Sequence, residues 1–202
     1  MSTIAEMPSG PGDKVLSAQS TFRSVMNAMA RPASVQRIAA LADAPAPMTP
    51  AMAAIALTLF DHDTPLWLDA QIAESPDVPR WLKFHTGAPV VHDCGMAAFA
   101  LIADGGRLPA LENFAFGSVD YPDRSTTVIV QAESLNAGCA YELRGPGIKG
   151  TATLQATIKP ADLFEQLRIN EVLFPRGIDT ILVADDAVVA IPRTTRLITK
   201  GS

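Results

Sequence analysis

Hydrophobic residues in the first part of the chain follow the period of amphipathic helices. Between residues 17 and 30 they recur every three or four positions, and Pro32 would end such a helix. The recurring residues, which we expect to face the core, are Phe22, Val25, Met26 and Met29. Thr49 and Pro50 are typical of a helix start, so a second helix is expected from there to a point near Asp61.

Short apolar runs bounded by turn residues predict strands after these helices. The runs are PLWLDA from Pro65, APVV from Ala88 and MAAFALIA from Met96. A short helix is expected before the second run, at residues 77–85, and a short helical piece after the third, at residues 108–114. Helices and strands therefore alternate in this half, as they do in α/β proteins.

The second half of the chain contains longer strand-like runs. STTVIVQAESL from Ser125, CAYELRG from Cys139 and GTATLQATI from Gly150 are separated by turn segments, which predicts an antiparallel meander. A helix over about residues 160–172 should follow. Its predicted core stripe comprises Leu163, Phe164, Leu167 and Val172. TILVA and AVVAI flank an acidic turn, Asp185–Asp186, and predict a closing hairpin.

These elements predict a single α/β domain, a three-layer fold around a mixed sheet. We place the domain at residues 15–198 and expect residues 1–14 to form a flexible N-terminal arm. The arm lacks the cationic start and apolar stretch of a signal peptide, and prolines interrupt the longest uncharged segment. The two cysteines, Cys94 and Cys139, lie in unrelated segments. We therefore expect reduced thiols, a cytoplasmic location and no transmembrane helix.

Composition indicates that part of the surface faces a partner. Hydrophobic residues make up 48% of the 202 residues and charged residues only 18%, which leaves generous apolar surface to bury. The formal net charge is −5. Nucleic acid is excluded as the main ligand, because neutralising its phosphates needs clustered lysines and arginines.

One glycine-rich loop has the residue spacing of a phosphate-binding pattern but not the helix that should follow it. Gly145, Gly147 and Gly150 have the G-x-G-x-x-G spacing. That pattern binds a pyrophosphate when a helix follows it, whereas the segment TATLQATI that follows here alternates like a strand. We therefore expect a tight turn between antiparallel strands.

Two histidine segments carry groups that could contact a ligand. Asp61, His62 and Asp63 adjoin at the expected end of a helix, where they could bind a metal or supply a general base, or simply cap the helix. A single cluster lacks the second, spaced pair that metal sites show, so no metal is expected. For His85, which begins HTGAPV, a turn-forming role and ligand contact both remain open.

The strongest candidates for phosphate contact lie near the end of the chain. Arg193, Thr194 and Thr195 follow a predicted strand, and a guanidinium with hydroxyl groups can hold phosphate or triphosphate oxygens. Arg176 with Asp179 could do the same. The alternatives are a charge that protects an edge strand from aggregation and an internal ion pair. No residue is assigned a catalytic role.

Five segments, in order along the chain, resemble one protein family. They are FRSVMNAMARPA from Phe22, LTLFDHDTPLWL from Leu57, HTGAPV from His85, FPRGIDTILV from Phe174 and AIPRTT from Ala190. The family they resemble is the PhnH subunit of bacterial carbon-phosphorus lyase, which extracts phosphate from alkylphosphonates. The resemblance extends from about Phe22 to Thr195.

The resemblance implies a subunit of the carbon-phosphorus lyase core complex, with PhnG, PhnI, PhnJ and PhnL-type subunits as partners. Such a complex joins methylphosphonate to C1 of the ribose of ATP and releases adenine, giving α-D-ribose 1-methylphosphonate 5-triphosphate. The alternative is a purely structural subunit with no substrate contact. In either role we expect the chain to be inactive alone and to form a homodimer when isolated.

The resemblance also implies the fold of a trimmed large domain of pyridoxal-phosphate-dependent transferases, without the cofactor. A pyridoxal cofactor needs a lysine for its Schiff base and an acid for its pyridine nitrogen. The lysines of this chain lie in expected termini, a short helix and turns, where solvated side chains are the simpler interpretation. No cofactor is therefore expected, and a self-sufficient transferase is the least favoured function.

Overall fold

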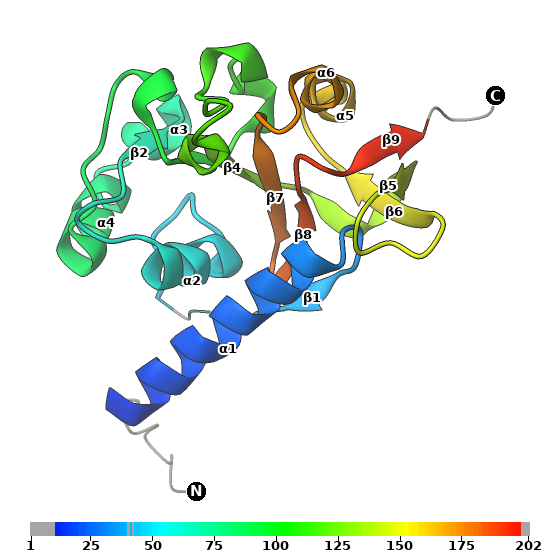
Figure 1. Ribbon diagram of the computed structural model, residues 1–202. Coiled ribbons are helices and arrows are strands. Elements are labelled where there is room, and N and C mark those ends of the chain that lie inside the picture. Colours follow the sequence, from blue (N-terminus) through cyan, green and yellow to red (C-terminus); the bar gives the residue numbers. More distant parts are fainter. Residues whose placement is uncertain (1–10, 40, 42, 199–202) are drawn as a thin grey trace, which may run out of the picture.

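The computed structural model describes residues 11–39, 41 and 43–198 (Figure 1). Most of the predicted N-terminal arm, residues 1–14, lies outside the described residues, and its last part already belongs to the first helix, α1 (Pro11–Ala30). None of the described helices is long and apolar enough to cross a lipid bilayer.

The sheet at the centre of the molecule is mixed, as predicted, and has six strands. Its strands are β1 (Gln36–Arg37), β2 (Leu66–Leu68), β3 (Phe99–Ile102), β4 (Thr127–Gln131), β7 (Asp179–Ala184) and β8 (Ala187–Ile191). The order is β1-β8-β7-β4-β3-β2. Strands β2, β3, β4 and β7 are parallel, whereas β8 is antiparallel to both β7 and β1. The predicted closing hairpin is confirmed as β7 and β8.

A second, antiparallel sheet lies beside the first. It consists of β5 (Ser134–Arg144), β6 (Ala152–Thr157) and β9 (Arg196–Ile198), in the order β6-β5-β9. The predicted meander was wrong in its first strand, because TVIVQ from that run forms β4 of the central sheet. The three middle residues of β4 are buried in succession, as expected of a parallel strand covered on both faces. The turn at Gly145–Gly150 does join antiparallel strands.

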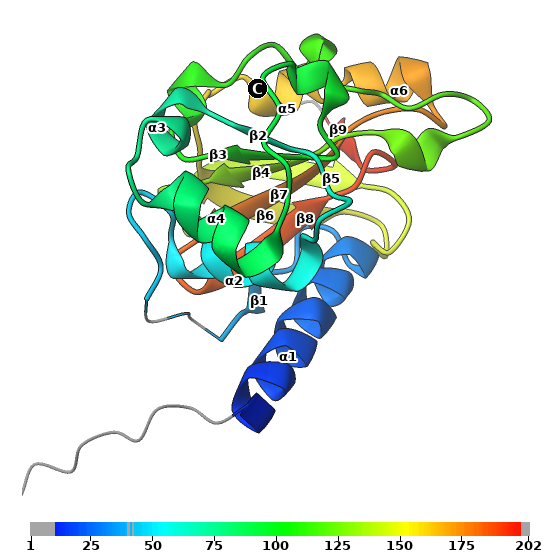
Figure 2. The ribbon, with the colours of Figure 1, turned by 90° about the vertical axis from the view of Figure 1, so that its left-hand side faces the viewer.

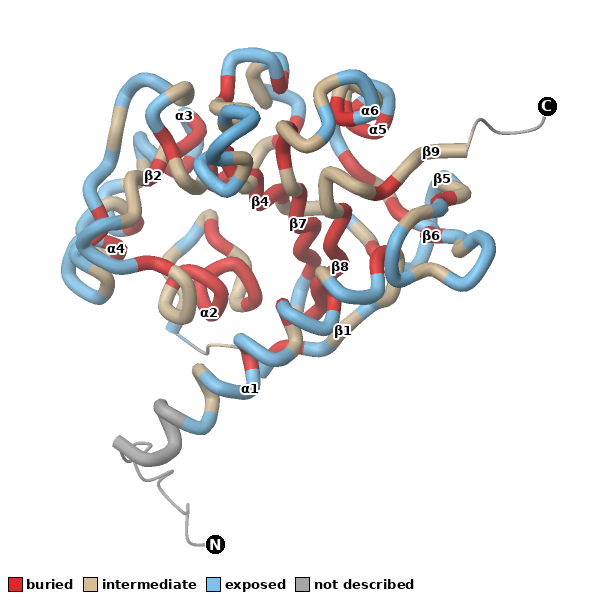
Figure 3. Tube along the Cα trace, viewed as in Figure 1, coloured by how far each residue is buried: buried red, intermediate tan, exposed pale blue. Residues whose placement is uncertain are grey.

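The central sheet is covered by different elements on its two faces (Figures 1 and 2). One face packs against α1, α2 (Pro50–Leu59), α3 (Ala70–Ala73) and α4 (Val78–Thr86). The other packs against the second sheet and α5 (Leu163–Gln166), which precedes α6 (Ile169–Leu173). The tube in Figure 3 shows β7 and β8 buried along most of their length between these two layers.

The connections among the described residues contain four short 3-10 helices. They are η1 (Cys94–Met96), η2 (Gly105–Arg107), η3 (Leu111–Asn113) and η4 (Pro122–Arg124). The predicted helical piece at residues 108–114 corresponds to η3. Of the predicted strand APVV, only Val90 pairs, through a single bridge to Leu66.

Helix α2 begins where the sequence predicts. The Thr49 hydroxyl accepts the N–H of Met52 at 3.3 Å, which is the hydrogen bond that a threonine N-cap makes. The Thr49 N–H in turn donates to the side-chain oxygen of Gln131 at 2.5 Å. The start of α2 is thereby attached to the end of strand β4.

The predicted core stripe of α1 was wrong at two of its four positions. Phe22 and Met26 are 48% and 50% exposed, and the residues that face inward are Thr21, Val25 and Ala28. The physical reason is that α2, β8 and β1 cover only one side of α1, which also projects beyond them (Figure 1). These neighbours therefore cover only part of the apolar stripe that the sequence predicts.

The helix predicted over residues 160–172 is broken into α5 and α6. Leu163, Phe164 and Leu167 are buried as predicted, whereas Val172 is 84% exposed. After the break between the two helices, the inward position is taken by Asn170, which is 2% exposed. The sequence pattern keeps one helical period from Leu163 to Val172. In the structure, the break between α5 and α6 interrupts that period.

Candidate functional site

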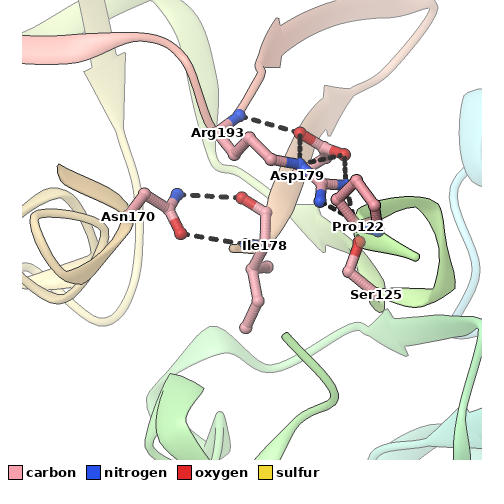
Figure 4. A network of polar contacts seen from close by, with 6 residues as sticks. All are labelled: Pro122, Ser125, Asn170, Ile178, Asp179 and Arg193. Carbon is pink, nitrogen blue, oxygen red and sulfur yellow. Dashed lines mark hydrogen bonds and ion pairs between the residues drawn. The ribbon is translucent and has the colours of Figure 1, made fainter. Parts of the chain in front are cut away.

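Arg193 and Asp179 form an ion pair at the amino ends of the parallel strands (Figure 4). Asp179 is the first residue of β7, and Arg193 follows β8 by two residues. Both side chains are only 14% exposed. The Arg193 Nε donates to the two carboxylate oxygens at 3.2 Å each, and the Arg193 backbone N–H donates to Oδ1 at 2.8 Å. Burial shields this pair from the screening that weakens surface ion pairs.

The remaining contacts of the Arg193 guanidinium tie a third segment to the pair. One terminal nitrogen donates to the carbonyl oxygen of Pro122, and the other donates to the Ser125 hydroxyl at 2.6 Å as well as to Asp179. All three guanidinium nitrogens are therefore bonded to protein. The internal ion pair, one of the alternatives considered for Arg193, is what the structure contains.

Asn170 makes a second buried attachment beside the ion pair (Figure 4). Its amide nitrogen donates to the carbonyl of Ile178 at 2.9 Å, and its side-chain oxygen accepts the N–H of Ile178 at 2.9 Å. Gly177 has a φ of +146°, and a Cβ there would stand 2.5 Å from Asn170 Oδ1. Sequence reasoning missed Asn170, because an asparagine within a predicted helix carries no signal of its own.

Exposed side chains lie in the segments next to the ion pair and Asn170. Phe174 is 56% exposed, and Val119 and Tyr121 are exposed on the loop that ends at Pro122. Arg176 is half-buried, and its side chain has no hydrogen bond or ion pair within the described part of the chain. The predicted partnership of Arg176 with Asp179 is therefore replaced by Arg193 with Asp179.

The two threonines after Arg193 do not form a phosphate cradle with it in this structure. Thr195 is buried, and its hydroxyl has no hydrogen-bond partner among the described residues. It lines a cavity of about 10 Å³ between the second sheet and α5, with room for one water molecule at most. The carbonyl of Thr194 lies close against Gly145. Access for a triphosphate would require these segments to separate.

Asp61 and Asp63 lie in an exposed turn, and His85 lies on α4, whose C-terminal end meets that turn. The Asp61 carboxylate accepts the Thr64 hydroxyl at 2.7 Å and the Asp63 N–H at 3.0 Å, and these bonds lower the pKa of Asp61. His62 lies 3.3 Å from the carboxylate of Asp63 and also beside Gly87, so two of the matched segments meet here.

His85 lies against aromatic rings rather than beside the acidic turn's carboxylates. Its ring is 4.8 Å from that of Trp81 and 4.9 Å from that of Phe84. Among the described residues no group of three histidine, cysteine or acidic side chains could hold a metal ion. These segments therefore make turn and helix-end contacts, with His85 and both aspartates open to solvent.

The carboxyl ends of the parallel strands, where α/β proteins often bind ligands, contain two open depressions. Their volumes are about 380 Å³ and 220 Å³, and Asp104 lines both. In the smaller one, the Lys159 ammonium lies 2.7 Å from Glu133, a contact that raises the pKa of Lys159. None of the sequence-predicted site residues lies in either depression.

Helix α2 starts at the smaller depression but offers no amide to an anion. The Thr49 N–H donates to Gln131, the Ala51 N–H to the carbonyl of Asp185 and the Met52 N–H to Thr49, while Pro50 has no N–H. A phosphate at a helix start is normally bound by free N–H groups of this turn. Here those groups are already used.

Comparison with known proteins gives consistent matches along the chain. Residues 9–198 match the family described as bacterial phosphonate metabolism protein (PhnH). The alpha-D-ribose 1-methylphosphonate 5-triphosphate synthase subunit PhnH of Rhizobium meliloti is 43% identical over 185 residues, 92% of each chain. HtxG of Stutzerimonas stutzeri, provisionally described as a C-P lyase subunit, is 31% identical over 188 residues, 91% of this chain and 87% of HtxG.

Proposed function

This chain belongs to the PhnH family of bacterial phosphonate metabolism proteins, and from that premise we propose that it is a subunit of a ribose 1-methylphosphonate 5-triphosphate synthase. The observation that carries the proposal is 43% identity to such a subunit over 92% of both chains. The chain would take part, in the cytoplasm, in the reaction of ATP with methylphosphonate that releases adenine. Its partners would be PhnG, PhnI, PhnJ and PhnL-type subunits.

A purely structural subunit is the second candidate, and the contacts of Arg193 favour it. A catalytic or binding arginine needs free donors, whereas each guanidinium nitrogen of Arg193 is bonded to protein. Arg176, Asp61, Asp63 and His85 keep accessible side chains and remain candidates for ligand or subunit contact. Thr194 and Thr195 would act through the position of the segment rather than through their hydroxyls.

We further propose that the single domain, residues 15–198, is a trimmed relative of the large domain of pyridoxal-phosphate-dependent transferases that works without the cofactor. The support is the mixed central sheet, with helices on one face and the second sheet with α5 on the other, and the ion pair of Lys159 with Glu133 at the carboxyl edge of the central sheet. A Schiff base requires a neutral amine. The hydrogen bond to Glu133 stabilises the charged form of Lys159 instead.

Adenine release from ATP and methylphosphonate tests the proposed function. The complex obtained by co-expressing this chain with PhnG, PhnI, PhnJ and PhnL should release adenine, and omitting this chain should lower the rate by about tenfold or more. The chain alone should release none. Adenine can be quantified by chromatography of the stopped reaction. An undiminished rate without this chain would contradict the proposal, and adenine release by the chain alone would identify a self-sufficient transferase.

Light scattering on the isolated protein tests its predicted self-association. We expect a particle of twice the 21.4 kDa chain mass, because several large apolar side chains, including Phe84 at 82% and Val172 at 84%, are exposed. A strictly monomeric species at concentrations on the order of micromolar would contradict the homodimer. The measurement does not depend on the other subunits.

A further inference from the structure

Helix α1 is partly supported by the rest of the protein and partly projects from it (Figures 1 and 2). Its contacts are with α2, β8 and β1. The side chains buried in those contacts, Thr21, Val25 and Ala28, all lie in the C-terminal half of the helix. Leu16, nearer the start, is 65% exposed. The supported half is packed on one side only, since Phe22 and Met26 in the same half are exposed.

The exposed side of α1 is apolar at positions that share a face. Phe22 and Met26 lie four residues apart, next to the buried face, and each is about half exposed. Two large side chains at this spacing are the usual anchors of a helix that binds in a groove of another protein. The core of this chain does not account for them, because α2 and β8 cover only the neighbouring face.

The chain segment that contains these anchors carries charged residues of one sign. Residues 16–41 contain three arginines and no aspartate or glutamate, although the whole chain has a net charge of −5. Arg37 is paired with Asp186, whereas Arg23 and Arg31 are exposed. A binding surface for α1 would therefore gain from carboxylates at its rim.

We propose that residues 16–31 of α1 and its C-terminal end bind an apolar groove, rimmed by carboxylates, on another subunit of the synthase. Phe22 and Met26 would enter the groove, and Arg23 and Arg31 would pair with its rim. This inference rests on the proposed function, since it names the surface through which the chain joins the complex. A second copy is a poorer occupant, because two-fold pairing through α1 would bring two cationic helices together.

The test measures binding of this chain to an immobilised complex of PhnG, PhnI, PhnJ and PhnL. The double variant Phe22→Ser/Met26→Ser should weaken binding by about tenfold or more, and Arg23→Glu by at least about threefold. Binding of the wild type should also weaken with salt. The matched control, Met96→Ser, removes an apolar side chain that is 68% exposed elsewhere on the surface and should stay within about twofold. Circular dichroism verifies that each variant is folded.

Several results would overturn the inference. If the α1 variants bind the complex like the wild type, α1 is not the docking element, although the proposed function stands. If the wild type itself does not bind the complex, the proposed function fails with the inference. The inference also fails if the variants keep complex binding but lose binding to vesicles of phosphatidylcholine and phosphatidylserine. If the α1 variants lose only self-association, α1 belongs to the homodimer interface and the inference is wrong.

Discussion

Replacing Arg193 by alanine is expected to lower the free energy of unfolding by about 3 kcal/mol, at the lower end of the cost of breaking a buried ion pair from one side, because this pair is largely but not fully buried. The substitution leaves the Asp179 carboxylate, 14% exposed, without its cation. It also removes the donors to the Pro122 carbonyl and the Ser125 hydroxyl, so three segments lose their common attachment. Urea denaturation monitored by circular dichroism measures the change.

Two further variants sharpen this experiment. Arg107→Ala breaks an exposed pair with Asp104, 3.6 Å apart, and should change the stability by no more than about 0.5 kcal/mol. Arg193→Met combined with Asp179→Leu removes both charges and should recover part of the loss. A normally stable Arg193→Ala protein whose complex releases adenine about tenfold more slowly would show instead that Arg193 contacts substrate or a partner.

The second large effect is expected at the turn between β5 and β6. Gly147 has a φ of +83°, and a Cβ there would stand 2.1 Å from the carbonyl oxygen of Ala30, the last residue of α1. Gly147→Ala must therefore displace the turn from the helix in addition to straining its own backbone. We expect a loss of about 3 kcal/mol or more in the free energy of unfolding.

Gly150 is the matched control, because its φ is similarly positive but it lacks the close contact. Its φ is +75°, and a Cβ added there would meet no other atom within 4 Å. Gly150→Ala should therefore cost only the conformational strain, about 1–2 kcal/mol. Urea denaturation of the two variants gives the comparison. Equal losses would mean that the approach to α1 is unimportant and that the backbone angle alone requires glycine.

Most local structure of this protein could be predicted because local signals and packing agree. The Thr49 cap and the β7–β8 hairpin are examples. Strand β4 could not be assigned to its sheet, because a run of buried β-branched residues suits both a parallel strand and a buried antiparallel one. The exposure of Phe22 and Met26 was not predictable from period alone, since it depends on which side of α1 its neighbours cover.

The sequence predicted several residues of the candidate site but not the contacts between them. Asp179 and Arg193 were both selected, yet Asp179 was assigned to Arg176. The register of the β7–β8 hairpin indicates the correct partner of Asp179. Thr180 lies opposite Ile191, so extending the register by one step brings Asp179 opposite Pro192, next to Arg193. Asn170 had no such signal, because its partner Ile178 belongs to a segment whose path depends on the break between α5 and α6.

The strand order has a consequence for the timing of synthesis. Strand β1, near the start of the chain, pairs with β8, near its end, and α1 rests on β8 as well. While the chain emerges from the ribosome, β1 and the side of α1 that rests on β8 must wait for residues 187–191. Helix α2, the other main support of α1, is made much earlier. An incomplete chain is therefore expected to hold α1 through α2 alone, and the helix is packed fully only when the last strand of the central sheet is in place.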